Sequence, residues 1–525
     1  MQKNYILSNL YFFLKSNSRS IKKLLTLYLL YRFYQYIRYT LYFRLNKNTM
    51  IKNILKTPII GGIIKEKLVN GTKILEDDLK NSYKNLTQLP DKGLDDNGVN
   101  CKIALLPNSN QDKDKISGII YHGGFKHKNR LVEIFRQFAF SNPLHPDVFP
   151  KIREMEIDIV NMAINLFKGD TSCSGNVTYG GTESILLACV TYRDYYKSKF
   201  GITKPNIVAL ESVHPAFDKA CHYFGIELIK VPINIKTGTS RIEDITNLLD
   251  RNTILLVGSA PSYAHGIIDP IVSMSQLAYN KNIAFHIDCC MGGFLIPFID
   301  DYKHINFSLK GVTSISLDTH KYGNSLKGSS ILLYKNYNIK KYQHFINKDW
   351  NGGIYCTPTM MGSKSGGLIA AAWASMLYMG YSEYSKIANM IKNNVNNIRY
   401  NIGRNTNITI IGKPNINILG FRSDTLNIYS IADELKKKGW NISIMQKPAA
   451  FHLCLTNLHT KEVCDKFCED LNNSVEAVLN SSNKKLSGTL ALYGSSQEVG
   501  TSMFIEEVIH DFIFLLSRKT ISERY

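Results

Sequence analysis

Lys321 stands in a sequence that could turn a lysine into a nucleophile. Residues 314–323 read SISLDTHKYG, an apolar-alternating run that ends in Asp318, Thr319, His320 and Lys321, followed by a glycine that permits a turn. Such a pattern places a lysine at the end of a buried strand. Because burial disfavours the charged ammonium, we expect a lowered pKa and an amine that can attack a carbonyl group to form a Schiff base.

A glycine-rich turn upstream could hold a phosphate group. Residues 180–184 read GGTES and lie between a β-like run at 176–179 and a helical pattern at 183–200. A turn of this kind directs backbone N–H groups at an anion, and the dipole of the following helix adds to the attraction. Thr182 and Ser184 add hydroxyl donors. By itself, the motif could also be an ordinary turn with a threonine cap.

Two further residues suit a flat, charged cofactor. Asp288 ends a predicted strand at 284–287, on the side where α/β folds place ligands, and could keep a ring nitrogen protonated. His214 follows a predicted strand at 207–210 and could stack on a planar ring. Alone, Asp288 could be a capping residue and His214 a structural one. In series with the glycine turn and the lysine, they predict a site for pyridoxal 5′-phosphate (PLP), an electron sink.

Three other segments could either line a site or be plain loops. Residues 142–150 read NPLHPDVFP, and the prolines exclude a helix or a central strand. The same two interpretations apply to Tyr121 and to residues 350–355, which read WNGGIY.

Residues 117–395 alternate short β-branched runs with helical patterns, which predicts βαβ units and a mostly parallel sheet. The strands expected there lie at 207–210, 227–231, 254–257, 284–287, 314–317 and 330–334, and the helices at 183–200 and 272–280. Residues 396–525 are expected to form a smaller unit, with strands at 408–411, 425–429 and 452–455 and helices at 430–438 and 461–480. Residues 61–116 are expected to form a helix and a connecting arm.

The N-terminal segment 1–60 is predicted to be a basic, aromatic membrane anchor. Of a net charge of +20, a large part comes from residues 1–64, which contain 11 Lys/Arg and no Asp or Glu. This points to a membrane surface and not to nucleic acid, although a composition rich in Asn, Lys, Ile and Tyr is the other explanation. Residues 24–43 could span a bilayer or lie on it. Their Leu, Ile and Phe side chains favour insertion by about 4.5 kcal/mol of transfer free energy, and the cost of inserting Arg32 and Arg38 offsets this. The ten cysteines are scattered, which suggests reduced thiols facing the cytosol.

With these motifs in view, the sequence resembles the sphingosine-1-phosphate lyases, within the PLP-dependent group II decarboxylase-like family. The similarity runs from about residue 55 to about residue 515. GGTES and DTHKYG fit the wider superfamily, whereas NPLHPD and the DWNGGIY…GSKSGG block point to the lyases. The matching stretches are TPIIGGIIKEKL (57–68), NPLHPDVFP (142–150), VTYGGTESILLACVTYRD (177–194), HPAFDKACHYFGIELIKVP (214–232), SAPSYAHGIIDP (259–270), HIDCCMGGFLIPF (286–298), GVTSISLDTHKYGNSLKGSSILLYKN (311–336), DWNGGIYCTPTMMGSKSGG (349–367) and KKGWNISIMQKPAAFHLCLT (437–456).

The resemblance implies an α/β fold of PLP-dependent fold type I, the aspartate aminotransferase-like fold. It implies a large PLP-binding domain with a mostly parallel sheet, a smaller α+β C-terminal domain and a homodimer with shared active sites. This chain departs from the family at Cys289, where many relatives have alanine, and in the less apolar segment 24–43.

The resemblance also assigns roles by position. Lys321 would form the Schiff base, Asp288 would pair with the pyridine nitrogen and His214 would stack on the ring. The residues implied at the cofactor phosphate are Gly181, Thr182 and His320, with Gly352 and Gly353 approaching from the other subunit. The residues implied at the substrate are Tyr121, Asn142 and His145. The candidates for proton transfer are Lys321, Tyr121 and His145, and no metal is implied.

The reaction implied is retro-aldol cleavage of a phosphorylated sphingoid base to a long-chain fatty aldehyde and phosphoethanolamine, in sphingolipid degradation. The implied location is the endoplasmic reticulum membrane, with the catalytic domain facing the cytosol. The alternative is an amino-acid decarboxylase, which needs a basic group for the α-carboxylate; the sequence points to none. A membrane-attached protein on an inactive scaffold is a third possibility, which the retained lysine, aspartate, histidine and glycine turn disfavour.

Overall fold

The computed structural model describes residues 86, 88–109, 111–414 and 416–480, together with 509, 510, 513, 514 and 516. The predicted membrane segment at 1–60 lies outside the described residues. Residues 108–493 form one compact unit, and residues 1–107 with 494–525 form another. Across the described ranges, no helix combines the length and the apolar character needed to cross a bilayer.

In the unit that contains both termini, one described helix is α5 (Asp96–Ala104), capped by Asp95. The Asp95 carboxylate accepts a hydrogen bond from the Gly98 N–H at 2.8 Å, which satisfies a donor that the helix itself leaves without a partner.

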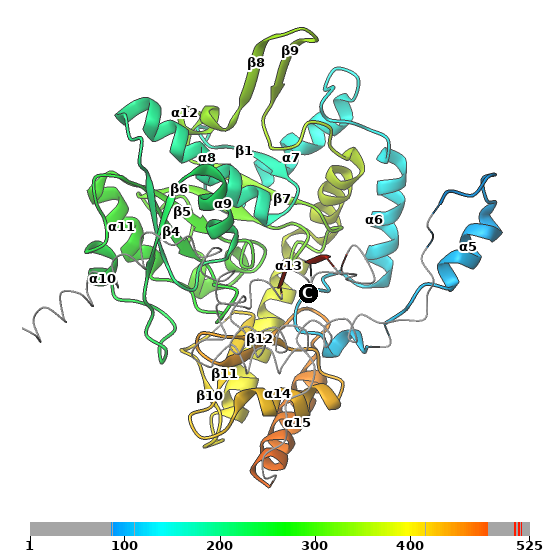
Figure 1. Cartoon of the computed structure of the whole chain (residues 1–525), viewed down its shortest axis with the longest axis vertical. Helices are drawn as coiled ribbons and strands as arrows, with labels where there is room; N and C mark the ends of the chain where they lie inside the picture. The colour runs from blue at the N-terminus through cyan, green and yellow to red at the C-terminus, as the bar shows by residue number, and fades with distance from the viewer. Residues whose placement is uncertain are drawn as a thin grey trace, which may run out of the picture. The chain divides into compact units, whose positions relative to one another are not determined.

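A seven-stranded sheet forms the centre of the unit 108–493 (Figure 1). Its strands, in order of pairing, are β1 (Ser174–Thr178), β7 (Ser330–Tyr334), β6 (Val312–Leu317), β5 (Ala284–Asp288), β4 (Thr253–Ser259), β2 (Asn206–Leu210) and β3 (Glu227–Val231). Within this described sheet, β7 alone runs against its neighbours. The mostly parallel α/β fold is therefore confirmed, with the six strands expected at 207–334 present within two residues of their predicted ends.

Helices cover both faces of the sheet because its inner strands β2, β4, β5 and β7 are buried on both sides. On β2, Ile207 and Ala209 belong to one buried cluster and Val208 and Leu210 to another. The first cluster lies under α8 (Gly181–Phe200) and α9 (Ala216–Phe224). The second lies under α7 (Pro150–Leu166), α11 (Ile271–Lys281) and α13 (Gly366–Ile402).

The remaining helices of this region are short or lie at its margin. They are α6 (Phe125–Phe138), α10 (Ile242–Thr246), α12 (Tyr337–Lys340) and the 3₁₀ turns η1 (Lys113–Lys115), η2 (Ile296–Phe298), η3 (Asp300–Tyr302) and η4 (Lys341–Gln343).

A second, antiparallel sheet follows α13 in the sequence. Its strands, in order of pairing, are β10 (Thr409–Ile410), β11 (Ile418–Arg422), β13 (Ala450–Cys454) and β12 (Ser443–Met445), accompanied by α14 (Ile428–Lys437) and α15 (Lys461–Leu479). The strand predicted at 425–429 is wrong. Asn427 caps α14 there by accepting a hydrogen bond from the Tyr429 N–H at 3.0 Å, so a capping side chain overrides the β-forming composition.

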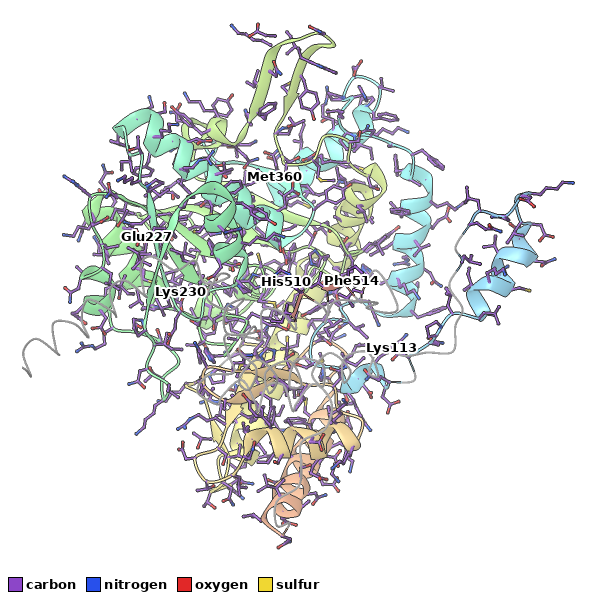
Figure 2. The ribbon with its side chains drawn as sticks, in the orientation of Figure 1. Lys113, Glu227, Lys230, Met360, His510 and Phe514 are labelled. Atoms are coloured by element: carbon purple, nitrogen blue, oxygen red, sulfur yellow. The ribbon has the colours of Figure 1, made fainter. Side chains whose placement is uncertain are left out.

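The segment around 350–355 is neither a plain loop nor a part of the main sheet. It forms the turn of a hairpin, β8 (Phe345–Trp350) and β9 (Gly353–Thr357), which projects from the sheet region in Figure 1. Every residue of β8 is exposed. Met360, labelled in Figure 2, lies at the base of the hairpin, and its backbone N–H donates to the Glu183 carboxylate of α8 at 2.9 Å.

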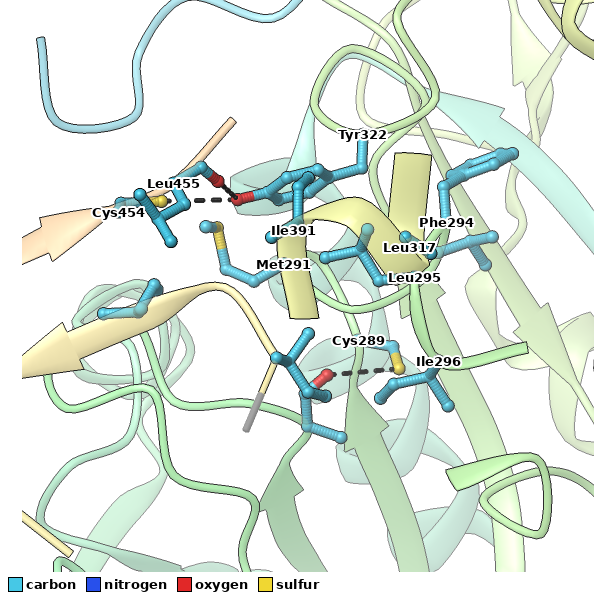
Figure 3. Packing of buried hydrophobic residues seen from close by; sticks show 14 of the residues in the cluster. Cys289, Met291, Phe294, Leu295, Ile296, Leu317, Tyr322, Ile391, Cys454 and Leu455 are labelled. Carbon is cyan, nitrogen blue, oxygen red and sulfur yellow. Dashed lines mark hydrogen bonds between the residues drawn. The ribbon is translucent and has the colours of Figure 1, made fainter. Parts of the chain in front are cut away.

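One buried cluster holds residues of both sheets, and Figure 3 shows part of it around Tyr322. The hydroxyl of Tyr322 donates to the Leu455 carbonyl at 2.6 Å and accepts from the Asn417 amide at 2.8 Å. The departure at Cys289 is accommodated in the same core, where its thiol donates to the Ala260 carbonyl at 3.4 Å. Burial raises the pKa of Cys289 well above its usual value, so the thiol stays protonated.

Candidate active site

A pocket of about 320 Å³ lies at the carboxyl ends of β4, β5 and β6. Six residues proposed for the cofactor line it together: Gly181, Thr182, His214, Asp288, His320 and Lys321. They come from distant parts of the sequence and meet because parallel strands end at the same edge of a sheet.

The first turn of α8 forms one wall of the pocket. Gly180 has a φ of 106°, a conformation that favours glycine. A methyl group on Gly181 would lie 2.8 Å from Cys290 Sγ and 2.9 Å from Asp318 Oδ1, so a larger residue here would displace side chains that line the pocket. His320 borders the same turn, since a methyl group on Gly180 would lie 3.4 Å from its Cε1.

Hydrogen bonds to neighbouring residues hold the side chains of Asp288 and His214 in place. The Asp288 carboxylate accepts hydrogen bonds from the Cys290 N–H at 3.1 Å and the Ser316 hydroxyl at 3.4 Å. The Nδ1 atom of His214 accepts from the Ala216 N–H at 3.1 Å. Burial lowers the pKa of His214, so its imidazole is neutral and presents an uncharged face to a ring.

The amine of Lys321 differs from the sequence prediction. Burial is the largest single influence and lowers its pKa, but the carboxylate of Asp318, 3.0 Å from Nζ, acts together with Cys290 and Asp288 and raises the pKa above the ordinary lysine value. The expectation of a lowered pKa was therefore wrong, because it counted burial and omitted a buried counter-charge three residues earlier. The lysine is a protonated ion pair in this structure.

Asp318 itself was missed as a functional residue. Its side chain is 1% exposed, and Oδ2 lies 3.6 Å from His320 Nε2 as well as 3.0 Å from Lys321 Nζ. Burial alone would raise the pKa of Asp318, yet the charges of Lys321 and His320 hold it below its usual value. The signal was present in the sequence as an acid directly after a buried strand and three residues before the lysine.

Tyr121 lies beside this cluster without lining the pocket. Its ring packs edge-on against Tyr322, with centroids 5.1 Å apart, and its hydroxyl is 3.8 Å from Cys454 Sγ. Burial, followed by the nearby Cys454, raises the pKa of Tyr121 well above its usual value, so the phenol keeps its proton. A phenol that keeps its proton suits a hydrogen-bond or proton donor better than a base.

A second lysine near Tyr121 was also missed. The ammonium of Lys327 lies 4.6 Å from the centroid of the Tyr121 ring. Burial lowers the pKa of Lys327 to about 8, and the neighbouring charge of Lys321 contributes. No motif marked this residue, because a lysine in a polar turn is usually a solvated side chain.

The other four predicted residues are elsewhere in the described structure. Asn142 donates to Ser363 Oγ at 3.0 Å, and His145 is exposed on the same loop. Pro143 and Leu144 between them line a separate cavity of about 400 Å³ along α7 and β1. Gly352 and Gly353 lie at the exposed turn of the β8–β9 hairpin.

The pocket fits PLP in its volume and in its donors. A glycine-cradled helix N-terminus suits the phosphate, a buried carboxylate suits the pyridine nitrogen, and the amine of Lys321 lines the same pocket. The chemistry of this donor set is that of a PLP enzyme.

Comparison with known proteins decides the family. The family model described as pyridoxal-dependent decarboxylase conserved domain matches residues 133–424. Sphingosine-1-phosphate lyase 1 of Rattus norvegicus is 39% identical over 480 residues, which cover 89% of this chain and 84% of that protein. This chain belongs to the sphingosine-1-phosphate lyase family. Its membership makes PLP the cofactor of the pocket and the chain a PLP-dependent lyase.

Solved structures agree with this membership. The sphingosine-1-phosphate lyase of Burkholderia pseudomallei has a TM-score of 0.71 and 33% identity, covering 76% of this chain and 94% of that one. Glutamate decarboxylase of Lactobacillus brevis has a TM-score of 0.67 at 18% identity, covering 78% and 98%, and shares the fold alone. The resemblance to the lyase family stated from sequence is thereby confirmed.

Proposed function

We propose that this chain cleaves phosphorylated sphingoid bases to a long-chain aldehyde and phosphoethanolamine. The observation that carries the proposal is the meeting of Lys321, Asp288 and the Gly181 turn in one pocket of a chain belonging to this family. Amino-acid decarboxylation is the competing reaction, since glutamate decarboxylase has the same fold.

When bound, PLP supplies an electron sink for the carbon–carbon bond that breaks. Asp288 would keep the pyridine nitrogen protonated and so keep the ring able to accept charge. His214 would cover one face of the ring. Lys321 would hold the cofactor, and its amine lines the pocket, whereas His145 is exposed on a different loop and Tyr121 lies beside the pocket.

Tyr121 and Lys327 act on the substrate in this proposal. The phenol keeps its proton and can donate a hydrogen bond to an oxygen of the substrate. The ammonium of Lys327, which lies over the Tyr121 ring, is a cation available to a phosphate group. A substrate phosphate in turn favours the charged form of a lysine that titrates near pH 8.

We also propose a homodimer in which the hairpin turn at Gly352 and Gly353 completes the partner's site. The support is the exposure of β8, whose aromatic residues Phe345 and Trp350 face solvent in the single chain. The test mixes Lys321→Ala and Gly353→Val subunits, each inactive alone. In an equimolar mixture about half of the dimers are mixed, and each mixed dimer keeps one intact site if the hairpin acts across subunits. The mixture should then recover about a quarter of wild-type activity, and none if the hairpin acts within its own chain.

Residues 1–56 are proposed to bind the endoplasmic reticulum membrane, with the catalytic domain facing the cytosol. A lipid substrate is delivered most readily to an enzyme held at its surface. A chain starting at residue 57 should be recovered in the soluble fraction with activity. Its complete retention on membranes would contradict this assignment.

The deciding experiment for the reaction compares purified wild type with Lys321→Ala in the presence of a phosphorylated sphingoid base. Wild type should show the visible absorbance of bound PLP and release fatty aldehyde, and the variant should show neither. A PLP band with CO₂ released from amino acids, and no aldehyde, would establish the decarboxylase instead. The absence of any PLP band in the wild type would mean an inactive scaffold.

A further inference from the structure

A row of polar side chains crosses the apolar layer beneath α8 and ends at Asp288. Tyr192 on α8 contacts Ser314, with 2.8 Å between the oxygens. Ser314 lies 2.8 Å from Nδ1 of His286, and Nε2 of that ring lies 3.1 Å from Ser316 Oγ. Ser316 reaches Asp288 Oδ1 at 3.4 Å. All five side chains are buried.

The pairing of two strands places this row. In the parallel register of β5 and β6, His286 is opposite Ser314 and Asp288 is opposite Ser316. Residues two apart on a strand share a face, so histidine, aspartate and both serines point the same way. The surrounding side chains are apolar, and Phe217 of α9 lies against His286 with ring centroids 6.1 Å apart.

The hydrogen bonds of the row can run in only one direction. A carboxylate only accepts, so the Ser316 hydroxyl donates to Asp288 and must accept from Nε2–H of His286. Burial lowers the pKa of His286 to about 4, so the ring is neutral and Nδ1 carries no hydrogen. Nδ1 therefore accepts from Ser314, which accepts from Tyr192. In each hydrogen bond of the row, the donor is therefore the partner farther from Asp288.

The Ser316 hydroxyl has all its hydrogen-bonding capacity in use. It accepts from His286 and from the Cys290 thiol, 3.4 Å away, and donates its one hydrogen to Asp288. It therefore cannot turn away from the carboxylate unless His286 changes tautomer. At the outer end of the row, the Tyr192 oxygen also lies 2.7 Å from Thr313 Oγ1.

We propose that His286 is a positioning residue that, through Ser316, fixes the orientation of the Asp288 carboxylate toward the PLP pyridine nitrogen. The proposal rests on the role of Asp288 in the proposed function. It gives a reason for a satisfied polar row inside an apolar layer, where an apolar filling would avoid the cost of burying polar groups.

The test measures PLP affinity of the apoenzyme by titration, together with the position and intensity of the visible PLP band. Ser316→Ala and His286→Phe should weaken PLP binding roughly 10- to 100-fold and alter the band, because a hydrogen bond to a charged group is lost. Ser316→Thr, which keeps the hydroxyl, should restore both. Ser474→Ala is the matched control, a buried serine whose hydroxyl bonds only to its own helix carbonyl at Asp470 in α15.

Ser314→Ala tests whether the whole row of hydrogen bonds, and not the Ser316–Asp288 contact alone, orients the carboxylate. Ser314 lies beyond His286 from Asp288, and its loss leaves Nδ1 of His286 without the donor that fixes the orientation of the ring, so the PLP band should change here too, though less than in Ser316→Ala. Wild-type affinity and band in both Ser316→Ala and His286→Phe would overturn the proposal. If His286→Phe fails to fold, Ser316→Ala decides alone, because it removes a single oxygen.

Asp288→Asn distinguishes this inference from the proposed function beneath it. Weak PLP binding in Asp288→Asn with unchanged binding in Ser316→Ala would refute the role of His286 and leave the role of Asp288 intact. Wild-type binding in Asp288→Asn would refute both roles.

Discussion

Asp318→Asn should release the Lys321 amine from the proton that the ion pair holds. The two charged groups are 3.0 Å apart. At an effective dielectric constant of about 20, unit charges at that distance attract by roughly 5 kcal/mol. Burial offsets part of this attraction, but the balance still raises the pKa of Lys321. If half of the attraction survives, asparagine increases the fraction of neutral amine about 100-fold.

The assay follows the covalent capture of PLP by the apoenzyme. Saturating PLP is mixed rapidly with the apoenzyme, and the first-order appearance of the visible band is recorded at several pH values. Only the neutral amine attacks, so the wild-type rate should rise about tenfold per pH unit through the neutral and alkaline range. Asp318→Asn should be faster near pH 8 by about 100-fold and should level off at a lower pH.

Asp318→Glu is the matched control, because it keeps the charge and changes only the reach of the side chain. It should retain the wild-type dependence of rate on pH. Identical profiles for wild type and Asp318→Asn would refute the reasoning, since they would show that the carboxylate does not hold the proton on the lysine.

Three further outcomes follow from other contacts. Gly181→Ala should weaken PLP binding roughly tenfold in the same titration, because its methyl group overpacks the cradle, whereas Gly93→Ala, with nothing within 4 Å of its methyl group, should bind normally. Tyr322→Phe should lower the free energy of unfolding in urea by about 1–3 kcal/mol, because the Leu455 carbonyl loses its donor; an unchanged midpoint would contradict this. Burial raises the pKa of Asp269 to about 7, above that of the unfolded chain, so its contribution to stability is present below about pH 4 and is lost as the pH rises through about 7. Asp269→Asn should remove that fall from a series of melting curves across this pH range.

The parts of the site that follow strand ends could be predicted from sequence. Asp288 and Lys321 each come at or just after a β-branched or apolar run, and the edge of a parallel sheet brings such residues together. The glycine turn at 180–181 could be assigned only in combination with these residues, since by itself it could also be an ordinary turn with a threonine cap.

What could not be predicted depends on contacts between residues far apart in the sequence or on competing local forces. The sign of the Lys321 pKa shift required knowing that Asp318 is buried within 3.0 Å. The strand predicted at 425–429 is absent because the side chain of Asn427 accepts a hydrogen bond from the Tyr429 N–H and so favours the start of a helix. The position of Lys327 over Tyr121 brings together two segments that are more than 200 residues apart in the sequence. Neither a motif nor a periodicity could link them.

The side chains of Lys321 and Tyr322 are adjacent in the chain but contact different parts of the fold. The lysine faces the cofactor pocket at the parallel sheet, whereas the tyrosine hydroxyl is bonded to Leu455 and Asn417, which flank the antiparallel sheet. A hybrid enzyme assembled by exchanging the C-terminal sheet between relatives would therefore inherit its lysine geometry from the donor of that sheet. Recombination breakpoints for engineering this scaffold have to keep 321–322, 417 and 455 from a single parent.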